Sequence, residues 1–115
     1  MWMITLIVWG ACSSPGGSGS DEPVEVAVET IFAEFREAVK HASDGEVDAS
    51  RERFDQAMIQ FEERLEPALK EACGQRCTTA IEYDLGRFRA QLSVSDEQAD
   101  AILDDLDKRV ASILK

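Results

Sequence analysis

The pattern of apolar and polar residues changes abruptly near residue 20. The first twelve residues are almost entirely apolar, and residues 13–20 are serine, glycine and proline. From Asp21 onward, apolar residues recur every three or four positions among charged ones, the spacing of one face of an α-helix. No run alternates apolar and polar residues as a half-buried strand does. The pattern predicts an all-α protein.

Four amphipathic helices are expected after residue 22. Their apolar positions, helix by helix, are Val28, Ile31, Phe32, Phe35, Ala38, Val39 and Ala42; Phe54, Ala57, Met58, Phe61, Leu65, Ala68, Leu69 and Ala72; Ile81, Leu85, Phe88 and Leu92; and Ile102, Leu103, Leu106, Val110, Ile113 and Leu114. Four such helices joined by short turns can bury one core as an antiparallel bundle. We place this single small domain at residues 23–115.

Local signals indicate where the first two helices begin and end. Pro23 suits a first helical turn, and Gly45 can take the left-handed conformation that ends a helix. Asp48 or Ser50 is the expected cap of the second helix. Pro67 is expected to kink that helix, because proline donates no backbone hydrogen bond and clashes with the preceding turn.

The last two helices carry stronger start signals. Thr79-Ala80-Ile81-Glu82 and Ser95-Asp96-Glu97-Gln98 both match the capping box, in which two side chains satisfy free backbone amides. Val94 and Ala99 are placed to form a hydrophobic staple beside the second box. Gly86 weakens the third helix, and we expect close approach of a neighbouring helix to be the reason for it.

The apolar start spans about eleven residues, fewer than the roughly twenty that cross a bilayer, so we interpret residues 1–11 as a signal peptide. Val8-Trp9-Gly10-Ala11-Cys12 resembles the lipobox of bacterial lipoproteins, although an aliphatic residue is usual where Trp9 stands. The resemblance implies cleavage before Cys12 and acylation of Cys12. It also implies a lipid anchor on the periplasmic face of the envelope, with Ser13 favouring the outer membrane over the inner. Residues 12–22 are the expected flexible linker.

Charge narrows the choice of partners. The 12 basic and 23 acidic residues all lie beyond Ser20 and give the chain a net charge of −11. Nucleic acids and anionic lipid surfaces are bound by basic patches, so this balance argues against both as direct partners. The balance is compatible with a cationic partner, with cations, or with an ordinary solvated surface.

Three cysteines are present, and acylation of Cys12 would leave Cys73 and Cys77 as a pair. The pair stands where the second predicted helix ends, and an exported protein meets an oxidising compartment. A structural disulfide is the favoured interpretation. A redox-active or metal-binding pair and free thiols are the alternatives, although a zinc site would need two further ligands and His41 is the chain's single histidine.

Carboxylates suggest a second, metal-related function. The two acidic groups are Glu62, Glu63 and Glu66 on the second predicted helix, and Asp100, Asp104, Asp105 and Asp107 on the fourth. If these faces met, their oxygens could bind a cation. Glu62, Glu63 and Glu66 are therefore candidate metal ligands, and no other cofactor is expected. The alternative is ordinary surface charge.

A further resemblance bears on this alternative. Residues 54–69, which end in Glu66-Pro67-Ala68-Leu69, and Leu85-Gly86-Arg87-Phe88-Arg89 resemble parts of the extracytoplasmic helical region that precedes some bacterial iron permeases. The resemblance implies an accessory domain in iron uptake or sequestration. The membrane-embedded motifs that define transport in that family are absent from this sequence.

Nothing in the sequence resembles an active site. His41 is expected to interact with the negative end of the first helix, and no nucleophile elbow or phosphate-binding glycine loop is found. The sequence therefore predicts a non-enzymatic lipoprotein. Its expected role is a binding or scaffolding module for an envelope protein.

Overall fold

The apolar stripes of the sequence become the core of a helical bundle. The computed structural model describes residues 22–115, so the expected signal peptide, Cys12 and almost all of the linker lie outside this part of the chain. The described elements are α1 (Val24–Ser43), α2 (Val47–Gln60), a π-helical turn η2 (Phe61–Leu65), α3 (Glu66–Gln91) and α4 (Asp96–Leu114). The predicted all-α bundle is confirmed.

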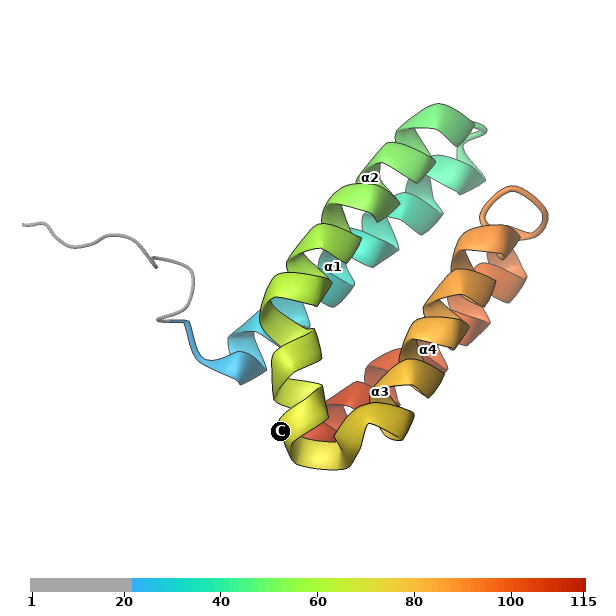
Figure 1. Ribbon diagram of the computed structural model, residues 1–115. Helices are drawn as coiled ribbons and strands as arrows, with labels where there is room; N and C mark the ends of the chain where they lie inside the picture. The colour runs from blue at the N-terminus through green and yellow to red at the C-terminus, as the bar shows by residue number, and fades with distance from the viewer. Residues whose placement is uncertain (1–21) are drawn as a thin grey trace, which may run out of the picture.

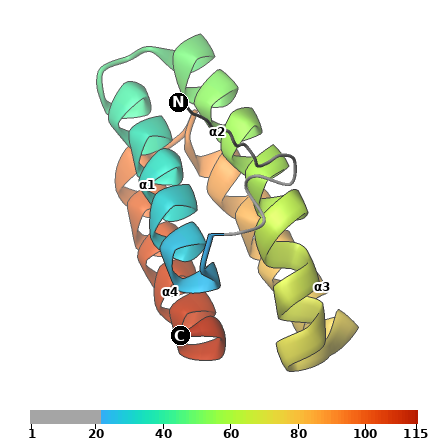
Figure 2. The ribbon, with the colours of Figure 1, turned by 90° about the vertical axis from the view of Figure 1, so that its left-hand side faces the viewer.

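Two helical hairpins form the bundle (Figure 1). One pairs α1 with α2, and the other pairs the second half of α3 with α4. The turns within the two hairpins lie at one end, whereas the corner that joins the hairpins lies at the other end with the C-terminus (Figure 2). Among residues 22–115, none of the helices is both long and apolar enough to cross a membrane.

The hydrophobic core contains most of the positions that helical spacing predicts, but Ala72 is exposed and Ala68 lies outside the core cluster. Its largest fully buried side chains include Phe32, Phe35, Phe61 and Phe88, and every predicted stripe residue of the third helix is buried. Ser50 is also buried, and its hydroxyl donates a hydrogen bond of 2.7 Å to the carbonyl of Ala38. A buried hydroxyl needs such a partner, and this bond ties α2 to α1.

Two of the expected helix starts are wrong. Pro23 precedes α1 as its N-cap instead of lying in the first turn, and its carbonyl accepts from the first free amides. Helix α2 begins at Val47 after Glu46, so neither Asp48 nor Ser50 caps it. The predicted end of α1 is confirmed, because Gly45 has a φ of 79°.

The interruption expected at Pro67 takes the form of a π-helical turn. The amide of Glu66 bonds to the carbonyl of Phe61, five residues back instead of four. The extra residue widens the turn before the proline ring, whose missing amide then falls at the start of α3. The helical path therefore continues through Pro67.

The sharp change of direction occurs at Gly74. This residue has a φ of 90° and a ψ of 172°, and α3 is helical on both sides of it. A side chain would strain this backbone conformation, which is why glycine suits the position. The chain thereby folds back, and residues on the two sides of Gly74 come to face each other.

The two capping boxes differ in outcome. The amide of Gln98 donates to the Ser95 hydroxyl at 3.2 Å, which confirms Ser95 as the cap of α4. The expected staple is wrong, because Val94 is 76% exposed. The box at Thr79 is also wrong, since Thr79 lies well inside α3. Helix α3 resumes at once after Gly74.

Gly86 has no close neighbour to explain it. A Cβ atom at this position would meet nothing within 4 Å, so the predicted close approach of another helix is wrong. Glycine in a helix interior costs conformational entropy without any compensating contact here.

We expect Gly86→Ala to raise the free energy of unfolding by about 1 kcal/mol, because alanine restricts the unfolded chain and fits the helical backbone. The urea unfolding midpoint measures the effect. Gly74→Ala is the matched control and should destabilise the protein, since its positive φ disfavours any side chain. A Gly86→Ala midpoint at or below that of the wild type would contradict the assignment of Gly86 as an exposed helix-interior residue.

Candidate functional site

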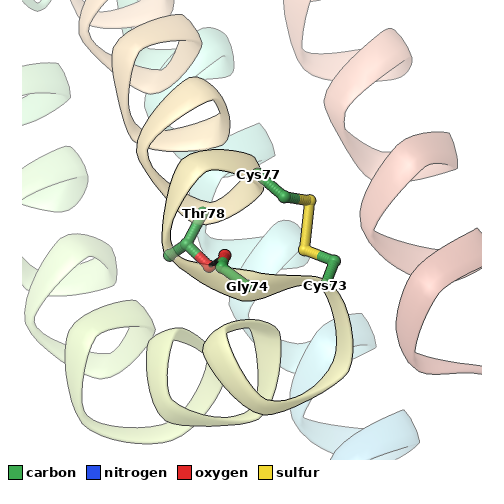
Figure 3. The surroundings of a disulfide bond; sticks show 4 residues. All are labelled: Cys73, Gly74, Cys77 and Thr78. Atoms are coloured by element: carbon green, nitrogen blue, oxygen red, sulfur yellow. Dashed lines mark hydrogen bonds between the residues drawn. A yellow bond between two sulfur atoms is a disulfide. The ribbon is translucent and has the colours of Figure 1, made fainter.

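A disulfide fixes the corner between the hairpins. Cys73 and Cys77 are bonded across Gly74 with their Cα atoms 5.7 Å apart, as the sequence predicts (Figure 3). The buried Thr78 hydroxyl donates to the carbonyl of Gly74 at 2.8 Å. The backbone of the corner is thus held by one covalent bond and one buried hydrogen bond.

An open groove lies beside this corner, on the outer face of α3. Its volume is about 750 Å³, and most of its lining is apolar. The groove is lined by Gln75, Arg76, Thr79, Ala80, Tyr83 and Asp84. Tyr83 is 70% exposed, which is unusual for a large side chain with an apolar ring. We call this feature the corner groove.

A second groove of about 390 Å³ separates α3 from α4. Ala80 lines both grooves, so they form one continuous surface. Cys77 lines the second groove from α3, and Lys108 and Arg109 line it from α4. We call it the α3–α4 groove.

Some charged residues on this surface form ion pairs and others do not. Asp84 accepts from Arg109 at 2.7 Å and from Arg87 at 3.0 Å. The hydrogen bond from Arg109 is the main cause that holds the pKa of Asp84 below its usual value. Arg76 and Lys108, in contrast, form no ion pair with any residue in the range 22–115. The surface therefore carries unpaired positive charge.

Two carboxyl groups from opposite sides of the Gly74 bend lie close together. Glu66 and Glu82 are equally distant in sequence from Gly74, and a side-chain hydrogen bond joins them. This bond, together with partial burial and repulsion from Glu66, raises the pKa of Glu82 to about 7. Lys70 opposes the shift, and Glu62 adds to it. Glu82 therefore keeps its proton to a higher pH than an ordinary glutamate does and loses it as the pH rises through about 7.

The predicted metal ligands are only partly brought together. Glu62 and Glu66 lie near Glu82, whereas Glu63 takes no part in this arrangement. In the described part of the chain, no group of three or more histidine, cysteine or carboxylate side chains has the geometry to hold a metal ion.

The acidic residues of α4 have different partners from those expected. Asp104 and Asp107 each accept a hydrogen bond of 2.9 Å from Arg36 of α1, and Asp100 lies 3.8 Å from the same guanidinium. Asp105 accepts from Arg109 at 3.1 Å. Asp100, Asp104 and Asp107 thus join α4 to α1, and Asp105 is paired within α4, so these carboxylates do not form a joint face with Glu62, Glu63 and Glu66.

His41 lies beside the turn between α1 and α2. Its Nδ1 atom is 2.7 Å from Oε1 of Glu46, and its carbonyl accepts from the Glu46 amide. The sequence places His41 correctly at the end of the first helix but does not reveal this partner. The two contacts close the turn.

Tyr83 was not among the candidate residues taken from the sequence. A signal for it exists, because Tyr83 lies off the apolar stripe of its own helix, which runs through Ile81, Leu85 and Phe88. An aromatic residue outside the stripe of an amphipathic helix is expected on the surface. The position of Lys108 beside a groove follows from the packing of α4 on α3.

Comparison of the chain with protein-family models, curated proteins and solved structures finds no significant match.

The raised pKa of Glu82 predicts a specific pH dependence of stability. Between pH 4.5 and about 7 the folded protein retains a proton that the unfolded chain releases, so stability falls as the pH rises through this window. We expect Glu82→Gln to weaken this fall, because glutamine keeps a hydrogen-bond donor for Glu66 at every pH. Urea midpoints at about pH 5 and about pH 8 measure it.

Glu63→Gln is the control for this experiment, because Glu63 is exposed and lies outside the pair. It should leave the pH dependence of the wild type unchanged. Equal pH dependence in the wild type and Glu82→Gln would show that the Glu66–Glu82 pair does not hold a proton.

Proposed function

We propose that this protein is a small, membrane-anchored lipoprotein of the bacterial envelope that binds or scaffolds an envelope protein without catalysing a reaction. Residues 1–11 act as the signal peptide, acylated Cys12 anchors the chain, and the linker through residue 22 carries the bundle. The corner groove with its exposed Tyr83 is the single observation that carries the binding role.

Several properties of the groove favour recognition of a protein. Tyrosine and arginine are the side chains most often found at energetically important positions of protein interfaces, and Tyr83 and Arg76 line the same groove. The disulfide beside them limits the conformational entropy lost on binding, because the backbone is already fixed. The interior of the bundle, in contrast, is filled with apolar side chains.

The location of the first helix fits a tether at residues 12–22. Helix α1 begins toward the end of the bundle that holds the corner and the C-terminus (Figure 1). Glu22 forms an ion pair with Arg64 of η2, so the chain enters the bundle at a defined place. On this proposal the corner groove lies toward the membrane, within reach of a membrane-associated partner.

The anchor is tested by Cys12→Ser. We expect the wild type in the membrane fraction and labelled by a palmitate analogue, and the variant to be unlabelled and released from the membrane. Cys73→Ser is the matched control and should keep both label and membrane association. A Cys12→Ser variant that stays in the membrane fraction would contradict the lipid anchor, since multiple acyl chains are what make such anchoring firm.

The binding role is tested by photo-crosslinking in intact cells. A photoreactive amino acid replaces Tyr83, and in a control strain it replaces Ile59, another exposed apolar residue, which lies on α2. We expect one envelope protein to be captured from position 83 and not from position 59. Capture of no envelope protein from position 83, or the same set of proteins from both positions, would contradict the proposed function.

A further inference from the structure

Most lysine and arginine side chains of the described residues are paired with carboxylates. The net charge is −11, and the guanidinium of Arg36 is matched to three carboxylates. Arg53, Arg64 and Lys115 each have a carboxylate partner as well. Arg76 and Lys108 have none within residues 22–115, and they flank the two grooves that meet at Ala80. Lys40 and Arg51 are also without an ion pair in this range, so two of the four such cations lie where the surface is also apolar.

Acidic groups near the grooves do not cancel this charge. Asp84, the carboxylate that lines the corner groove, is already bonded to Arg109, and so is Asp105 of α4. Asp84 also pairs with Arg87. The residues that line the two grooves thus include the cations Arg76, Lys108 and Arg109 but only one carboxylate, Asp84, even though the molecule as a whole is strongly negative.

We propose that the corner groove and the α3–α4 groove together bind an acidic segment of a partner protein that also carries an apolar side chain. The carboxylates of that segment pair with Arg76 and Lys108, and its apolar side chain packs on the ring of Tyr83. This inference rests on the proposed function and names the chemistry of its partner.

Charge complementarity favours a protein segment over the other anionic partners. A lipid bilayer or a nucleic acid presents many negative charges over a wide area and would be repelled by the remaining acidic surface. A short acidic segment meets only the local field, because salt screens charges beyond about 8 Å. The largely apolar lining around Tyr83 adds a contact that a phosphate backbone cannot use.

Tyr83 itself provides the signal for a direct test. It is the single tyrosine of the chain, so isotope labelling of tyrosine gives one ring signal in an NMR spectrum of the full-length protein in non-ionic detergent. The probe is a short glutamate peptide with two central leucines. The comparison peptides are the same sequence with lysine in place of glutamate, and a glutamate peptide without leucine.

We expect the glutamate–leucine peptide to shift the Tyr83 signal in a saturable manner, the lysine peptide to leave it in place, and the peptide without leucine to bind more weakly. Arg76→Glu combined with Lys108→Glu should weaken binding at least about tenfold. Arg76→Gln with Lys108→Gln should weaken it less. Circular dichroism checks that each variant is folded.

Lys40→Glu with Arg51→Glu is the matched control, because these cations also form no ion pair within residues 22–115 but line neither groove. It should change the affinity less than about twofold. An equal shift from the lysine peptide, or equal weakening by both charge-reversal pairs, overturns the proposal.

The Tyr83 signal also distinguishes two other occupants of the grooves from an acidic protein segment. A shift that depends on protein concentration alone indicates a second copy of the chain, and a shift seen only with phosphatidylglycerol vesicles indicates a lipid surface. Either result overturns the proposal of an acidic protein segment.

Failure of this inference and failure of the proposed function are distinguishable. If position 83 still captures its envelope protein after both charge reversals, the module function stands and the acidic segment is wrong. If position 83 captures no envelope protein, the proposed function fails whatever the peptides do.

Discussion

Mutual contact of three phenylalanine rings holds the bundle together. Phe35 of α1, Phe54 of α2 and Phe88 of α3 lie with their ring centroids between 5.5 and 5.9 Å apart in all three pairings. Such pairs add about 0.5–1.5 kcal/mol beyond the burial of their area. Since each ring belongs to a different helix, this cluster joins the two hairpins. Arg89 lies 5.7 Å from the Phe54 ring and covers the cluster from outside.

Helical periodicity is sufficient to predict this core, because burial of apolar stripes is what drives the helices together. The corner is less predictable. Thr79 and Glu82 match a capping box, yet Thr78 bonds to Gly74 and the helix resumes earlier. Short motifs describe local preference, whereas the disulfide and the positive φ of Gly74 decide where the chain turns. The predicted contacts of Val94 and Gly86 are wrong for a related reason: they depend on neighbouring helices, which the apolar pattern of a single helix does not define.

In the candidate site, too, the sequence identifies the residue types but not their partners. Sequence identifies Glu66 as part of an acidic group, but its closest partner, Glu82, comes near only because the chain folds back at Gly74. Asp100, Asp104 and Asp107 are likewise recognisable as an acidic face, and the fold turns that face toward Arg36. Long-range pairing of this kind depends on which helix faces which. The exposure of Tyr83, in contrast, can be predicted from the sequence, since this residue lies off the apolar stripe of its helix.

Gly74 also determines whether the two hairpins pack against each other within a single chain. It is the one residue between Val47 and Gln91 with non-helical backbone angles. If that residue became helical, α2, η2 and α3 would form a single rod, and the two hairpins would separate. Each hairpin could then recover its buried contacts only from a second copy, by exchange of identical halves. The left-handed glycine and the adjacent disulfide are therefore the elements that favour a closed monomer over an exchanged dimer.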